Sequence, residues 1–278
     1  MNYEDPNYPY SDFGEVISLV RLPDKTSICA GYSSGEARIF NYVQGNLTTT
    51  FRGHRSAVTA IAVDEQSGSL MATGGADCEI IIWDLVALSG VARLHEHKDV
   101  VTGLAFLSRD DQKLLLSVSK DTLLKVWDLE TRHCIQTVVG HRSEIWSLSL
   151  LPSQDISKIR VFTGSADELI RVYKVNEIAD KKRGDEEEQV LVFFGAIERS
   201  AGVDRCASLA MNSSQNLLAA QSSGKFVDVS ARPYPSSATL TTSSSPSSAD
   251  LPPQGYRRSK EKDEAASQAT AEQGPEGA

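Results

Sequence analysis

Three histidines in this chain each accompany a hydroxyl residue and an aspartate, a combination of side chains that could do chemistry. In each set the Ser or Thr stands four residues before the Asp, and an aromatic residue stands six after it. The sets are His54, Thr73, Asp77 and Trp83; His97, Ser117, Asp121 and Trp127; and His141, Thr163, Asp167 and Tyr173. Such residues are the components of a hydrolytic triad, and three histidines together could bind a metal ion.

The sets recur with the period of a structural repeat. Trp83-Asp84 returns 44 residues later as Trp127-Asp128. A second series has intervals of 43 and 44 residues and consists of Gly53-His54, Glu96-His97 and Gly140-His141. A period in the low forties with Gly-His and Trp-Asp dipeptides is the signature of WD40 repeats, in which each unit is a blade of four short strands. Because each set then belongs to its own blade, the three histidines are too far apart to share an ion, and the recurrence favours a structural device over catalysis.

The repeat predicts an all-β fold, a partial WD40 β-propeller of about five four-stranded blades, the last incomplete. We expect four complete blades over 14–52, 57–94, 100–139 and from 145 onward, and a fifth with three strands over 206–229. A seven-bladed ring needs roughly 300 ordered residues, since propeller blades here repeat about every 44. We therefore expect an open ring, in a piece of a longer protein, a truncated product, or a ring completed by another chain.

Composition divides the chain into three parts. Residues 1–13 read as a loose lead-in, and 14–230 as propeller blades interrupted by a charged loop at 178–189. Residues 231–278 hold six of the ten prolines and a Ser-rich run, so we expect a disordered tail.

The spacing within each set has a mechanical interpretation. The Asp lies in the turn between the second and third strands, where it can accept a hydrogen bond from the His ring, whose other nitrogen meets the hydroxyl. That hydroxyl can accept from the Trp indole. Losing one member should cost about 1–3 kcal/mol. Because a phenol replaces the indole at Tyr173, we expect the fourth blade to be the weakest of these three. We also expect Asp121→Ala to destabilise more than Asp64→Ala, because only Asp121 lies in a buried network. We assign no catalytic, metal-binding or cofactor-binding residue.

Charge and composition exclude other classes. Acidic residues outnumber basic ones 37 to 28, a net charge of -9, which argues against coating nucleic acid by charge alone. The four cysteines form no Cys-x-x-Cys pair, so neither a disulfide framework nor a zinc finger is expected. No apolar stretch approaches the roughly 20 residues that span a bilayer. We expect an intracellular protein with no membrane partner and no small-molecule substrate.

Three stretches, 28–40, 74–107 and 117–148, resemble consecutive blades of the first propeller of the WD-repeat protein in the UTP-B module of the small-subunit processome. The resemblance extends from about residue 28 to 175 and continues weakly over 204–229. It implies a non-enzymatic scaffold in 18S rRNA maturation, located in the nucleolus, with other UTP-B subunits as partners and contact with U3 small nucleolar RNA or pre-rRNA left open. Members of that family are much longer, with a second propeller and a helical C-terminal region.

Two alternatives remain at this point. A substrate receptor of a cullin-type ubiquitin ligase would carry Arg two residues after Trp-Asp, where this chain has Val86, Glu130 and, in the fourth blade, Asn176. That alternative is disfavoured. A generic protein-interaction scaffold in signalling, trafficking or chromatin is not excluded.

Overall fold

The structure is a computed structural model that describes residues 14–109, 112–151, 153, 155–176, 189–199, 205–211, 217–222 and 227–230. The expected lead-in and the Pro/Ser-rich tail lie outside these residues, as does the charged loop apart from Gln189. Within the described part, no helix is both long enough and apolar enough to cross a bilayer.

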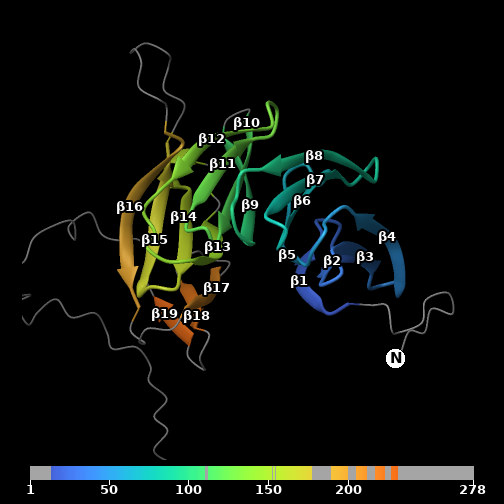
Figure 1. Ribbon diagram of the computed structural model, residues 1–278, viewed down its shortest axis with the longest axis horizontal. Helices are drawn as coiled ribbons and strands as arrows, with labels where there is room; N and C mark the ends of the chain where they lie inside the picture. Colours follow the sequence, from blue (N-terminus) through green and yellow to red (C-terminus); the bar gives the residue numbers. More distant parts are fainter. Residues whose placement is uncertain are drawn as a thin grey trace, which may run out of the picture. The chain divides into compact units, whose positions relative to one another are not determined.

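The described residues form five antiparallel sheets, four with four strands and the last with three, and within each sheet the strands follow one another in sequence order (Figure 1). The first two sheets contain β1 (Val16–Arg21), β2 (Ser27–Tyr32), β3 (Glu36–Asn41), β4 (Asn46–Arg52), β5 (Val58–Val63), β6 (Leu70–Gly75), β7 (Glu79–Asp84) and β8 (Ser89–His95). The third and fourth contain β9 (Val101–Arg109), β10 (Gln112–Ser119), β11 (Leu124–Asp128), β12 (His133–Val138), β13 (Ile145–Leu151), β14 (Arg160–Ser165), β15 (Leu169–Val175) and β16 (Leu191–Glu198), with the short 3-10 helix η2 (Ile156–Lys158) between β13 and β14. The fifth contains β17 (Cys206–Met211), β18 (Leu218–Ser222) and β19 (Val227–Ser230).

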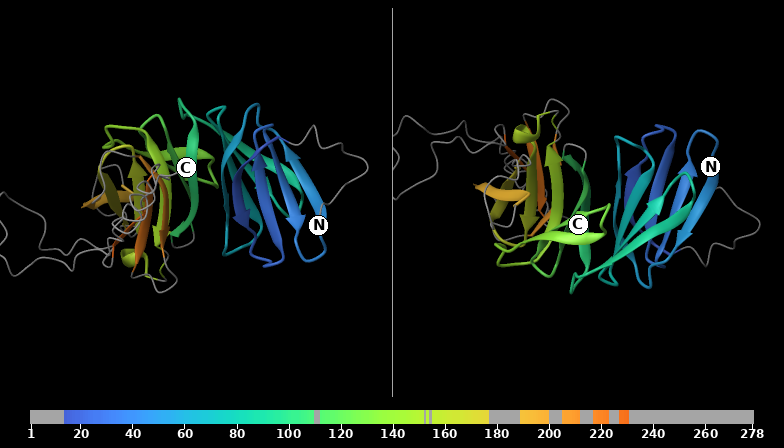
Figure 2. Two further views of the ribbon diagram at one scale, coloured as in Figure 1. Left: turned by 90° about the horizontal axis from the view of Figure 1, so that it is seen from below. Right: turned by 90° about the horizontal axis from the view of Figure 1, so that it is seen from above.

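These sheets are the blades of a partial WD40 propeller, so the fold class predicted from the repeat is confirmed. The inner strands pack in the order β1, β5, β9, β13 and β17, each against the next (Figure 2 shows the first two sheets packed together). The fifth blade is a three-stranded sheet within the described residues, as the sequence predicted.

Alternation along the strands fills the spaces between blades. Successive side chains of a strand point to opposite faces of its sheet. In β7, Ile81 and Trp83 join the core shared with the first blade, whereas Ile80 and Ile82 join the core shared with the third. A blade buried on both faces therefore needs an unbroken apolar strand, which is what Ile80–Trp83 supplies.

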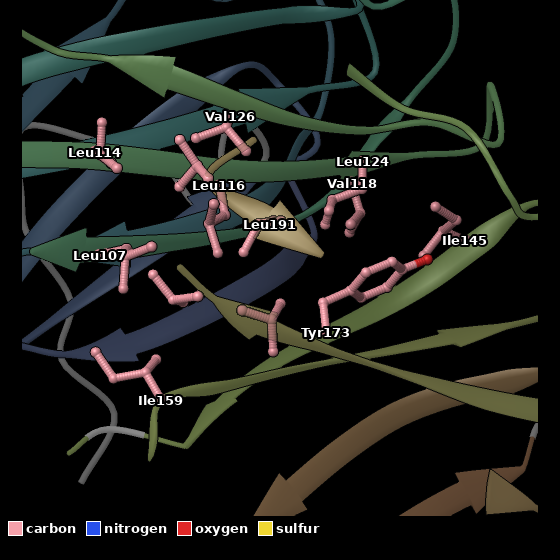
Figure 3. Packing of buried hydrophobic residues seen from close by; sticks show 13 residues of the cluster. Leu107, Leu114, Leu116, Val118, Leu124, Val126, Ile145, Ile159, Tyr173 and Leu191 are labelled. Atoms are coloured by element: carbon pink, nitrogen blue, oxygen red, sulfur yellow. The ribbon is translucent and has the colours of Figure 1, made fainter. Parts of the chain in front are cut away.

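One hydrophobic core lies between each pair of consecutive blades. The core between the third and fourth blades contains Leu114, Leu116 and Val118 from β10 and Ile145 from β13, all fully buried (Figure 3). Tyr173 belongs to the same cluster, with its ring beside Ile145. Stability is thus distributed over four junctions, each of which depends on both blades that it joins.

A hydroxyl also joins each blade to the next. Near the start of every inner strand but the last, a Ser or Thr hydroxyl donates to the carbonyl oxygen of the first residue of the following inner strand. The four bonds are Ser18 to Val58 (2.9 Å), Thr59 to Val101 (2.6 Å), Thr102 to Ile145 (2.6 Å) and Ser147 to Cys206 (3.1 Å). At the bond between Ser147 and Cys206, Gly164 allows strands β14 and β17 to approach closely, since a Cβ at that position would lie 2.6 Å from the Cys206 sulfur. We call these four hydrogen bonds the inter-blade clasp.

Replacing Thr102 by Val keeps the shape of the side chain but removes one clasp. We expect the free energy of unfolding to fall by about 1 kcal/mol, because the Ile145 carbonyl loses its donor. Thr48→Val on the exposed outer strand β4 is the matched control and should leave stability unchanged. Urea unfolding of both variants measures the difference, and equal midpoints would show that the clasp contributes nothing.

Candidate functional site

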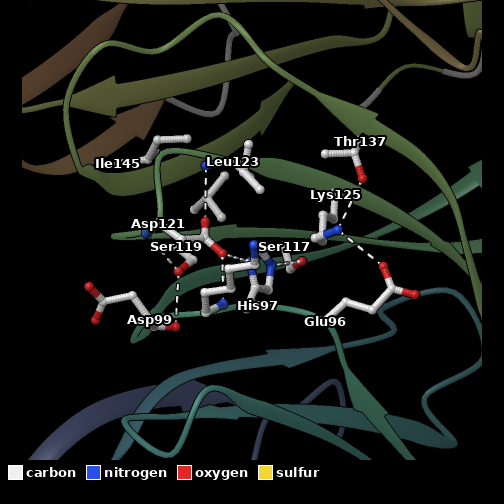
Figure 4. A network of polar contacts seen from close by, with 12 residues as sticks. Glu96, His97, Asp99, Ser117, Ser119, Asp121, Leu123, Lys125, Thr137 and Ile145 are labelled. Atoms are coloured by element: carbon white, nitrogen blue, oxygen red, sulfur yellow. Dashed lines mark hydrogen bonds and ion pairs between the residues drawn. The ribbon is translucent and has the colours of Figure 1, made fainter.

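The third blade brings all four residues of its set together, and Figure 4 shows His97, Ser117 and Asp121 among them. His97 Nδ1 lies 2.7 Å from Asp121 Oδ2, and His97 Nε2 lies 2.7 Å from Ser117 Oγ. The Trp127 indole Nε1 donates to the same Ser117 oxygen at 2.8 Å. Asp121 also accepts from the amides of Lys98 and Leu123, both at 3.0 Å, so its carboxylate fixes the turn that carries it.

The second blade repeats this arrangement with Thr in place of Ser. His54 Nδ1 lies 3.0 Å from Asp77 Oδ1, and its Nε2 lies 2.9 Å from Thr73 Oγ1. Trp83 donates to that hydroxyl at 2.8 Å. The four types of residue therefore form one hydrogen-bonded chain within a blade. It joins the segment that carries the His and precedes the inner strand to the second and third strands and to the turn between them.

Electrostatics favour the ionised carboxylate in both blades. Burial by itself would raise the pKa of Asp121, but hydrogen bonds from His97 and from the Lys98 amide outweigh it and hold the pKa below the ordinary value. At Asp77 burial likewise acts to raise the pKa, but hydrogen bonds from the Arg55 amide and His54 outweigh it, so the pKa of Asp77 is also lowered. Each imidazole thus faces a negatively charged acceptor at neutral pH.

The fourth blade does not form the expected contact between His141 and Asp167. A guanidinium takes that place, since Arg171 Nη1 lies 3.1 Å from His141 Nδ1 and 2.8 Å from Asp167 Oδ2. His141 Nε2 lies 3.0 Å from Thr163 Oγ1 and 3.3 Å from the Tyr173 hydroxyl. The set is therefore assembled around an additional residue that the spacing alone did not indicate.

The turn that carries the aspartate explains this difference. In the first three blades the corresponding turn contains one residue with positive φ, namely Gly35 (88°), Cys78 (65°) or Thr122 (71°). Glu168, at the same place in the fourth blade, does not have positive φ. Asp167 Oδ1 accepts instead from Ser165 Oγ at 2.7 Å, and its second oxygen faces Arg171.

The donor pattern reverses the tautomer of the fourth histidine. A carboxylate only accepts, so Nδ1 of His54 and His97 must carry a hydrogen. A guanidinium only donates, so Nδ1 of His141 must accept and its hydrogen lies on Nε2, directed at Thr163. Burial and, after it, the charge of Arg171 lower the pKa of His141 to about 4, with Asp167 opposing them in part.

Acidification should weaken the fold through His141. The unfolded chain binds a proton near pH 6.5, whereas folded His141 does so only near its pKa of about 4. Its contribution is therefore complete above about 6.5 and is lost as the pH falls, by about 2 kcal/mol at about pH 5. Urea unfolding of the wild type and of His141→Gln at both pH values measures this, and the variant should show the shallower dependence. Parallel curves would contradict the assignment.

In chemical terms the third-blade set has the connectivity of a hydrolytic triad, with Ser117, His97 and Asp121 in sequence. The Ser117 hydroxyl is, however, 0% exposed and already accepts from the Trp127 indole. A nucleophile needs an open face toward its substrate, and this oxygen has none. Across the described residues no group of three or more His, Cys, Asp and Glu side chains could hold a metal ion. Each of the three histidines lies in a different connection between consecutive sheets.

Two features differ from what the sequence indicated. Asp64 was expected to lie outside any buried network, but it is 4% exposed and accepts from Ser67 Oγ, so it is a poor control for Asp121. No role for Arg171 was predicted from the sequence. Its signal in the sequence is its position two residues before Tyr173, because the same position holds Ile81 in the second blade and Lys125 in the third.

Comparison with known proteins identifies the family. The family model that describes the WDR3 first beta-propeller domain matches residues 9–175, more than half of the chain. Nuclear distribution protein nudF 1 of Talaromyces marneffei is 33% identical over 48% of this chain and 28% of its own length. The U3 snoRNP-associated protein-like EMB2271 of Arabidopsis thaliana is 33% identical over 45% of this chain and 24% of its own. Transducin beta-like protein 3 of Mus musculus is 34% identical over 38% of this chain and 13% of its own.

The chain thus spans less than a third of each of these relatives, while the family match covers the first three blades and the first three strands of the fourth. WD40 propellers generally bind other proteins and do not catalyse reactions. The chain belongs to the family of the WDR3 first beta-propeller domain.

Proposed function

We propose that this chain is a non-enzymatic scaffold in ribosome biogenesis, which supports assembly of the small-subunit processome and maturation of the 18S pre-rRNA. The observation that carries the proposal is the family match over residues 9–175, and the similarity to a protein named as U3 snoRNP-associated supports it. The partners are other protein subunits of the UTP-B module, and the location is the nucleolus. Direct contact with U3 small nucleolar RNA or pre-rRNA is a further part of the proposal.

The buried hydrogen-bonded sets serve this role as structural devices. His97 and His54 have side chains that are 0% and 1% exposed, so neither can exchange protons with a substrate. A scaffold needs blades whose conformation does not change when partner proteins bind to their loops. The three sets supply that rigidity by fixing the aspartate turn to the body of each blade.

Depletion of the gene product with re-expression tests the proposal. Wild-type protein should restore 18S rRNA, concentrate in the nucleolus and co-purify U3 small nucleolar RNA. Asp99→Ala, an exposed substitution, should do the same, whereas Asp121→Ala should fail. Unchanged levels of 18S precursors on depletion would overturn the assignment to ribosome biogenesis.

The similarity to nuclear distribution protein nudF 1 favours a second candidate, a protein-interaction scaffold outside ribosome assembly. This candidate predicts normal pre-rRNA processing and misplaced nuclei on depletion. The depletion experiment distinguishes the two candidate functions, because one predicts a change in 18S rRNA precursors and the other a change in the positions of nuclei.

A further inference from the structure

Trp146 lies between cations from the blades on either side of its own. It is the second residue of β13, and its ring centroid is 4.2 Å from the Lys120 ammonium and 4.1 Å from the guanidinium carbon of Arg205. Lys120 comes from the turn between β10 and β11, and Arg205 directly precedes β17. Three consecutive blades thus contribute one residue each to a cluster at the end of the sheets where the inner strands begin.

The repeat itself does not require these residues. The second position of the inner strand holds Ile17, Thr59, Thr102, Trp146 and Ala207 in the five blades. Thr59 and Thr102 use that position for the clasp, but in the first and fourth blades the clasp is made one residue later, by Ser18 and Ser147. Lys120 likewise takes a position that holds Ala76 and Ala166 in the neighbouring blades, where only the backbone amide is used. Trp146 and Lys120 are therefore departures from the repeat.

The cluster is electrostatically incomplete. Among the described residues neither Lys120 nor Arg205 forms an ion pair with a carboxylate, and both cations approach a single indole, so their charges repel. The Trp146 Nε1 hydrogen is buried and has no hydrogen-bond partner in the described part of the chain. Arg205 is exposed, and Lys120 and Trp146 are partly exposed. An anionic group beside the ring, within reach of both cations, would offset their positive charges.

The surroundings discriminate between anionic partners. Both cations stack on Trp146, which limits the free aromatic face on which a nucleic acid base would stack. Exposed carboxylates of Asp99, Glu144 and Glu168 also stand at this end of the sheets, where a phosphodiester backbone would need continuous positive charge. A peptide can place one or two carboxylates on Lys120 and Arg205 and avoid the rest.

We propose that Lys120, Trp146 and Arg205 form a binding site for an acidic segment of a partner protein. The indole holds the two cationic side chains at a fixed separation, so that less of their conformational freedom is lost on binding. This inference does not depend on the assignment to ribosome biogenesis, because it rests only on the geometry of the cluster.

Titration of the full chain with a fluorescein-labelled peptide that carries two glutamates among neutral residues tests the site by anisotropy. We expect saturable binding that weakens with salt and a change in tryptophan fluorescence, which would report on Trp146 since Trp83 and Trp127 are buried. The double variant Lys120→Glu/Arg205→Glu should weaken binding at least about tenfold. Lys158→Glu, an exposed charge reversal in η2 at the other end of the same blade, should bind within about twofold of wild type.

Circular dichroism of each variant shows whether it is folded, and single Lys120→Gln and Arg205→Gln variants serve if the double variant is not. Each single variant should then weaken the affinity by itself. Equal affinity in wild type and the folded charge variants would overturn the proposal. So would tighter binding of a single-stranded oligouridylate than of the peptide, which would assign the cluster to nucleic acid.

Discussion

Asp121→Ala should lower the free energy of unfolding by about 3 kcal/mol, because it removes an acceptor that serves three donors in a buried place. His97 Nδ1 and the Lys98 amide share one carboxylate oxygen, and the Leu123 amide uses the other. The His97 side chain is 0% exposed, so water cannot replace the lost partner. Denaturant unfolding at pH 7.5 (about one unit above the ordinary pKa of His) measures the loss.

Two further variants sharpen this test. Asp121→Asn keeps one oxygen but replaces the other by a donor, so it should fall between wild type and Asp121→Ala. Asp99→Ala in the same blade removes an exposed carboxylate whose hydrogen bond is to the amide of the next residue, Val100, and should have little effect. If Asp99→Ala and Asp121→Ala were equally unstable, the buried chain of hydrogen bonds would not be what stabilises the blade.

Strand positions could be predicted from the sequence because two independent signals indicate them. One is the alternation of side chains along a strand, and the other is the recurrence of each strand with the period of the blades. The blades predicted over 57–94 and 206–229 agree to within one residue at each end with β5 to β8 and β17 to β19. Each inner strand repeats its pattern of apolar and small residues at the same phase as the next blade. An error in one blade is therefore corrected by its neighbours, which explains why even the outlying fifth sheet was located.

The arrangement of the fourth set could not be predicted in the same way. Thr163, Asp167 and Tyr173 keep the four-residue and six-residue spacing of the other blades, and spacing does not report which way a carboxylate points. That direction is decided by the turn at Glu168 and by the long side chain of Arg171, which reaches across from the next strand. A repeat predicts where each residue lies in the chain, but local backbone geometry decides which hydrogen-bond partner its side chain meets.

Contacts between blades were also invisible in the sequence. The clasp uses Ser and Thr, which are common in strands, so the pattern contains nothing unusual. The Trp146 cluster joins residues that are 26 and 59 positions apart. Such contacts arise only from the stacking of whole sheets, whereas the repeat describes one sheet at a time.

Arg171→Met should destabilise the protein by about 3 kcal/mol at neutral pH, since it leaves a partly buried carboxylate and an imidazole without their shared donor. Asp167 cannot turn toward His141 in compensation, because its other oxygen is held by Ser165 Oγ at 2.7 Å and by the Leu169 amide at 3.0 Å. Arg171→Lys keeps the charge with a shorter reach and should lose less.

The matched control is Lys125→Met, at the same strand position in the third blade. Lys125 binds Glu96, whose side chain is 47% exposed and can return to water, so this variant should cost less than Arg171→Met. The pH dependence supplies a second, independent readout. Removing the positive charge raises the pKa of His141 from about 4 toward its ordinary value, so the loss of stability between about pH 6.5 and pH 5 should shrink in Arg171→Met. Equal destabilisation by the two variants, together with an unchanged pH dependence, would show that the guanidinium does not control the fourth histidine.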